Sequence, residues 1–71
     1  MITVQTMLEK YEMRKQECEE CFDDNVKELK LNNNLSQDRI DWLHDNMKCL
    51  NAQIGVYECI IKDLKELLEW R

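Results

Sequence analysis

Glycine and proline are almost absent from this chain, which has one glycine and no proline in 71 residues. Because these residues supply most tight turns and phosphate-binding loops, their scarcity argues against a multi-stranded sheet and a nucleotide-binding loop. Histidine is also scarce, since His44 is the single one, and no serine or cysteine lies in a nucleophile-elbow sequence. One short domain without a deep cleft or a catalytic constellation is not an enzyme, so we expect a non-catalytic protein.

An excess of positive charge and long apolar runs are missing as well. Fifteen acidic and ten basic residues give a net charge of −5 and a pI near 4.8. This charge disfavours direct binding to nucleic acid or to an anionic membrane surface. No apolar run has the length of a membrane span, and the first residues do not resemble a signal peptide. We therefore expect a cytoplasmic protein whose four cysteines are reduced thiols.

Apolar residues are instead abundant, at 44%, and regularly spaced. In the second half of the chain they alternate at intervals of three and four, as the a and d positions of a heptad repeat do. These residues are Ile40, Leu43, Met47, Leu50, Ile54, Tyr57, Ile61, Leu64 and Leu68. Ser36 is the expected N-cap, and Asp38 follows it, where negative charge favours a helix N-terminus. The pattern predicts a helix over residues 37–70.

The first half repeats this spacing with weaker residues and predicts a helix over residues 2–31. Its a and d positions are Val4, Leu8, Tyr11, Lys15, Cys18, Phe22, Asn25 and Leu29. Lys15 and Asn25 interrupt the apolar pattern, and polar residues at such positions lower stability but can select register or partner number. For Lys15 we favour the simpler interpretation, in which the side-chain stem packs and the ammonium extends to water.

Three asparagines, Asn32, Asn33 and Asn34, separate the two halves and predict a loop over residues 32–36. Asparagine is poor inside helices and tolerates the left-handed conformation that ends them. The alternative is one continuous rod, in which the four-residue phase shift forms a stutter. We favour an all-α antiparallel hairpin that forms a single domain over residues 1–71, because a rod leaves the asparagine cluster unexplained.

Two registers of the hairpin remain open. In one, the numbers of facing residues sum to 72, which pairs Leu8 with Leu64 and Cys18 with Ile54. In the other they sum to 65, which pairs Leu8 with Tyr57 and Cys18 with Met47.

A lone hairpin of this size buries too little apolar area to offset the ordering of its backbone. Beside the a and d positions, the second helix contains a C-terminal apolar patch of Val56, Ile60, Leu67 and Trp70. If exposed, this patch is larger than soluble monomers usually tolerate. We therefore predict a protein-protein interface there, most simply with a second copy in a dimeric four-helix bundle. The alternative is that these residues only widen the contact within the hairpin.

The predicted function is that of a small scaffold, adaptor or inhibitor that acts through helix packing on itself or another protein. A second hypothesis uses an acidic patch on the first helix, made of Glu17, Glu19, Glu20, Asp23 and Asp24. Such a patch can be a decoy for the nucleic-acid-binding surface of another protein, although charge runs are usually solvated faces.

A third hypothesis is a metal or redox switch at Cys18 and Cys21, which form a C-x-x-C sequence. Two sulfurs three residues apart on a helix can share one metal ion. The remaining candidate ligands, His44, Cys49 and Cys59, point in different directions or lie about 15 Å apart along a helix. We therefore expect no complete metal site within one chain and no cofactor, and we interpret Cys18 as a small buried apolar residue.

Overall fold

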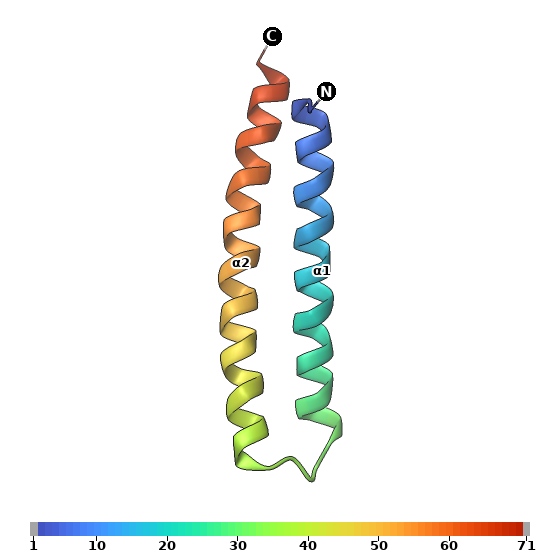
Figure 1. Ribbon diagram of the computed structural model, residues 1–71, viewed down its shortest axis with the longest axis vertical. Helices are drawn as coiled ribbons and strands as arrows, with labels where there is room; N and C mark the ends of the chain where they lie inside the picture. The colour runs from blue at the N-terminus through green and yellow to red at the C-terminus, as the bar shows by residue number, and fades with distance from the viewer. Residues whose placement is uncertain (1, 71) are drawn as a thin grey trace.

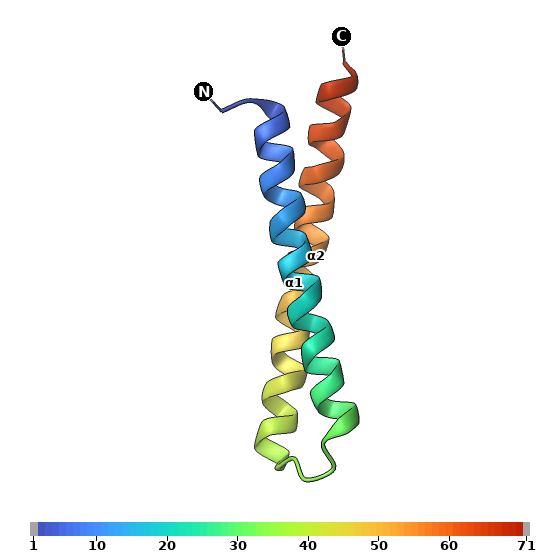
Figure 2. The same cartoon turned by 90° about the vertical axis from the view of Figure 1, so that its right-hand side faces the viewer.

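The protein is a hairpin of two long antiparallel helices, seen in a computed structural model that describes residues 2–70 (Figure 1). Helix α1 spans Val4–Leu31 and helix α2 spans Gln37–Glu69. The two termini lie at one end and the loop at the other, and the helices cross at a shallow angle (Figure 2). The longest dimension is 55 Å, well short of the roughly 100 Å of a continuous rod. The predicted all-α hairpin is therefore confirmed.

Capping residues set where the helices begin. Helix α1 starts at Val4 rather than at residue 2, because the Thr3 side chain accepts a hydrogen bond from the Thr6 backbone N–H at 3.1 Å. Ser36 is the N-cap of α2, as predicted, and its Oγ accepts a hydrogen bond from the Arg39 backbone N–H at 3.2 Å. Each cap satisfies a backbone donor that has no partner inside the helix.

The loop is formed by a different mechanism from the one expected. Asn32 has an extended conformation, with φ −108° and ψ 107°, and no residue in 2–70 has a positive φ. The loop lies at residues 32–36 as predicted, but none of its asparagines adopts the left-handed conformation. Instead, the Asn32 side-chain oxygen accepts a hydrogen bond from the Asn34 backbone N–H at 3.0 Å. This is an Asx-turn, in which a side chain replaces the backbone acceptor of a turn.

The core is one narrow layer between the helices. Every predicted a and d position is buried or half-buried, and Leu8, Leu43, Ile61 and Leu64 are the fully buried residues within the described chain. Two contacts across the helices decide the register. Lys15 lies 3.7 Å from Glu58, and the Cys18 thiol donates to Gln53 at 3.5 Å. The residue numbers of these two pairs sum to 73 and 71. Both sums are close to 72, so the helices pack in the register of 72 and not in that of 65.

The two polar residues in the core layer differ in how well they are accommodated. The Lys15 ammonium lies 3.6 Å from Glu19 and 3.7 Å from Glu58, at the edge of the layer, so the interpretation given for Lys15 is confirmed. Asn25, by contrast, has a buried side-chain Nδ2 with no hydrogen-bond partner. A buried donor without a partner costs roughly 1–3 kcal/mol of stability.

A cluster of three side chains joins the helices at the loop end. The Arg39 guanidinium donates to both carboxylate oxygens of Glu28, at 2.6 Å and 2.8 Å, and lies 4.4 Å from the centre of the Trp42 ring. The hydrogen bonds from Arg39 lower the pKa of the Glu28 carboxyl group below its ordinary value of 4.5. They also raise the pKa of Arg39. The bidentate contact thus favours the charged form of both groups.

Replacing Asn25 by leucine is expected to stabilise the hairpin by about 1 kcal/mol or more beyond any gain in helix propensity. Asn51→Leu is the matched control, because Asn51 is an exposed helical asparagine and receives the same propensity gain. Urea unfolding of both variants at one protein concentration measures the difference. Equal effects of the two substitutions would show that burial of the Asn25 amide does not lower the stability of the hairpin.

The Glu28–Arg39 pair predicts a pH dependence of stability. Because the folded state lowers the Glu28 pKa, the ionised carboxylate stabilises the fold above about pH 4.5. This contribution is lost as the pH falls through the lowered pKa of the folded state. The urea midpoint of Glu28→Gln should therefore lie below that of the unmodified chain at pH 7, and the gap should close in acid. A gap that stays constant down to pH 2 contradicts the assignment.

Candidate protein interaction surface

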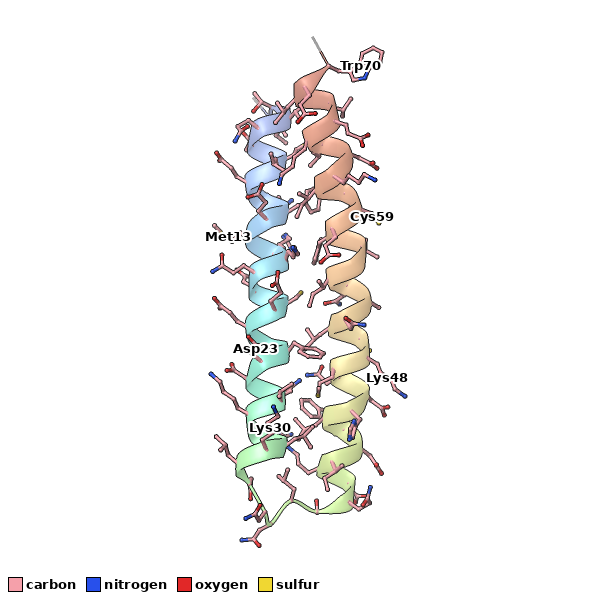
Figure 3. All side chains as sticks on the ribbon, turned by 180° about the vertical axis from the view of Figure 1, so that it is seen from behind. Met13, Asp23, Lys30, Lys48, Cys59 and Trp70 are labelled. Atoms are coloured by element: carbon pink, nitrogen blue, oxygen red, sulfur yellow. The ribbon has the colours of Figure 1, made fainter. Side chains whose placement is uncertain are left out.

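Exposed apolar side chains gather on one side of α2 toward its C-terminal end. In the predicted C-terminal apolar patch, Val56 is 57% exposed, Leu67 is 59% exposed and Trp70 is 85% exposed. Trp70 projects away from the hairpin at its terminal end (Figure 3). Ile60 differs, because it is half-buried and packs against the cluster of Leu8, Ile61 and Leu64. The hairpin core therefore covers part of Ile60 and leaves the other three patch residues in solvent.

The patch belongs to a longer stripe that sequence analysis missed. Starting at Trp42, positions on this side of α2 again alternate at intervals of four and three. We call them the lateral stripe: Trp42, Asn46, Cys49, Gln53, Val56, Ile60, Asp63, Leu67 and Trp70. Six are apolar and three are polar, and Trp42 and Cys49 are exposed. The regular spacing was the available signal, but the polar residues at three of nine positions conceal it.

The lateral stripe and the a and d positions occupy different sides of the same helix. With 3.5 residues per turn, the mean directions of the two sets differ by about 100°. This is close to the right angle between the two neighbours of each helix in a square four-helix bundle. Helix α2 can therefore pack against α1 and against a further helix at the same time.

The two ends of the lateral stripe have different surroundings. At the loop end, the Arg39 guanidinium lies over the Trp42 ring, so the hairpin itself covers part of this side chain. At the terminal end, Leu67 and Trp70 line a shallow hollow with Asp63 and Glu66. A second hollow lies beside Val56. The apolar surface that the lateral stripe leaves open is thus concentrated in the C-terminal half of α2.

The acidic patch lies on the outer surface of α1. All five carboxylates, Glu17, Glu19, Glu20, Asp23 and Asp24, are exposed, and Asp23 points away from α2 (Figure 3). Glu19 is paired with Lys15 at 3.6 Å, and Glu20 accepts a hydrogen bond from Gln16. Cys21 is exposed, because it lies outside the a and d positions.

The cysteines and the histidine are dispersed. Cys18 is half-buried, whereas Cys21, Cys49 and Cys59 are exposed, and Cys59 lies on the outer side of α2 (Figure 3). His44 is also exposed. Within residues 2–70, no three side chains of the metal-ligating types His, Cys, Asp and Glu converge on one point. Cys18 and Cys21 therefore have no third ligand near them in the described part of the chain.

Neither helix, over the residues that the structure describes, has the length and hydrophobicity needed to cross a membrane. Comparison with protein families, curated proteins and solved structures finds no match to this chain.

Proposed function

We propose that this chain is a non-catalytic protein-protein interaction module, a scaffold, adaptor or inhibitor that binds through helix packing. The observation behind this proposal is the lateral stripe, whose exposed apolar residues follow the spacing that helices use to pack on one another. A face of this kind is a docking surface for another helix. The polar residues within it supply selectivity rather than affinity.

The surface area of the hairpin supports the same proposal. The chain exposes 5839 Å², whereas a compact folded monomer of 8.7 kDa exposes about 4,700 Å². The excess of about 1,100 Å² exceeds the roughly 800 Å² that each partner contributes to a standard protein interface. One additional packed surface therefore brings the exposed area close to that of an ordinary folded protein.

The proposed partners are a second copy of the chain, which gives a homodimeric four-helix bundle, and a further protein. The net charge of −5 favours a protein partner over nucleic acid or an anionic membrane. The four free cysteines are in keeping with a cytoplasmic location.

Substituting Val56→Asp or Leu67→Asp should dissociate the homodimer, because two-fold symmetry would bury two carboxylates in the interface, one from each copy. We expect the dimer dissociation constant to rise at least about 100-fold, measured by sedimentation at micromolar concentration. Met13→Asp is the control, since Met13 is 63% exposed on the outer side of α1 (Figure 3). Ile60→Asp is unsuitable because Ile60 also packs in the hairpin core.

Circular dichroism of each variant verifies that the helices persist. An unmodified chain that sediments as a monomer at every concentration removes self-association from the proposal.

The acidic decoy is a second candidate, favoured by the density of the exposed acidic patch. Five carboxylates over residues 17–24 span about 10 Å of helix axis, in which one DNA strand presents about three phosphates. We rank it second because so short a stretch imitates so few phosphates. Changing Glu19, Glu20, Asp23 and Asp24 to their amides should abolish salt-sensitive binding to a basic DNA-binding protein, measured by titration. Binding that survives the change rules the decoy out.

A further inference from the structure

Between Cys49 and Leu67, the lateral stripe is complementary to itself in one antiparallel register. When the numbers of facing residues sum to 116, Val56 lies opposite Ile60 of a second copy and Cys49 lies opposite Leu67. The polar residues also coincide, because Gln53 lies opposite Asp63. Two-fold symmetry repeats each of these pairs. Apolar residues thus meet apolar residues, and polar residues meet polar residues, over the central part of the interface.

The polar pair has a suitable hydrogen-bonding arrangement within the hairpin. The Cys18 thiol donates to Oε1 of Gln53 at 3.5 Å, which directs that oxygen toward α1. The Nε2 amino group of Gln53 is then the donor available on the lateral side, and a carboxylate such as that of Asp63 is its natural acceptor. Asp63 is exposed in the hairpin. The two groups therefore satisfy one another when a second copy packs in this register.

Other arrangements of the same stripe are less favourable. A parallel dimer in register places Asp63 against Asp63, and like charges in an interface are repulsive. An antiparallel dimer shifted by one heptad, to a sum of 109, places Val56 opposite Gln53. A shift the other way, to 123, places Ile60 opposite Asp63. Each alternative places an unsuitable pair inside the overlap, whereas in the register of 116 the one mismatched pair, Asn46 with Trp70, lies just beyond it.

The overlap of the two copies leaves out the end of the lateral stripe that the hairpin already covers. In the register of 116, residues 47–69 of each α2 overlap, and the loop ends extend beyond the dimer. Trp42 then lies outside the interface, at the point where Arg39 already covers its ring. The exposed residues Val56 and Leu67 lie inside the overlap.

We propose that the occupant of the lateral stripe is helix α2 of a second copy, packed antiparallel in the register of 116. This inference rests on the proposed function as a self-associating interaction module. It adds the orientation, the facing residues and the position of the two-fold axis beside residue 58.

Two exposed cysteines report on this geometry. At 1.5 Å of rise per residue, the two Cys59 residues are offset by only about 3 Å along the axis. The two Cys49 residues are offset by about 27 Å. In a parallel dimer in register neither pair is offset, and Cys49 lies directly in the interface.

The test compares two variants that both retain Cys18, so that the contact with Gln53 is kept. Cys21→Ser with Cys49→Ser leaves Cys59, and Cys21→Ser with Cys59→Ser leaves Cys49. Each is treated with a bismaleimide that has a two-carbon spacer, at a concentration where sedimentation shows a dimer. We expect covalent dimer from the Cys59 variant and at least about tenfold less from the Cys49 variant.

The register is overturned if Cys49 crosslinks as strongly as Cys59, or if neither residue crosslinks in a chain that sediments as a dimer. Either result leaves the proposed function intact. A chain that is monomeric throughout overturns both the register and self-association.

A charge substitution gives an independent measurement. In the register of 116, Gln53→Lys places an ammonium opposite Asp63 and should lower the dimer dissociation constant at least about twofold. Gln53→Glu places two carboxylates together and should raise it. In a parallel dimer both substitutions juxtapose like charges, so weakening by Gln53→Lys contradicts the proposal.

Discussion

A hairpin of two helices has a single internal interface, and this constraint governs the rest of the molecule. The interface fully buries only Leu8, Leu43, Ile61 and Leu64 among the described residues. Every other apolar side chain must lie at the edge of this layer or in solvent. In the proposed function, stability and binding are linked, because a partner that covers the remaining apolar surface also supplies the core that the hairpin lacks.

The two helices contribute unequally to that remaining surface. Outside its a and d positions α1 is mostly charged, and it bears the acidic patch. Helix α2 contains a second heptad-spaced stripe, with Val56 and Leu67 exposed at its centre and end. A helix with two such stripes about 100° apart can pack against two neighbours at once, whereas the single apolar stripe of α1 is used by its packing against α2.

Polar residues at packing positions differ in what they cost the hairpin. The Lys15 ammonium finds Glu19 and Glu58 at the edge of the layer, so its position costs little. Asn25 has no partner for its buried amide and lowers stability. Gln53 is held by Cys18 within the hairpin. In the antiparallel dimer proposed for α2, the same residue faces Asp63, which links the interior of the hairpin to the choice of register.

Sequence spacing predicted the two helices, and the asparagine cluster favoured the hairpin over a rod, because apolar periodicity, capping and helix termination are local properties that short stretches of chain express. Ser36 as N-cap follows from the same local chemistry. The tertiary structure decided the register, the cluster of Glu28, Arg39 and Trp42, and the half-burial of Ile60. These features depend on contacts between the two helices, and residues that lie far apart in the chain meet only once both helices have packed. Heptad spacing is compatible with more than one register, and the side-chain contacts between the helices select one of them.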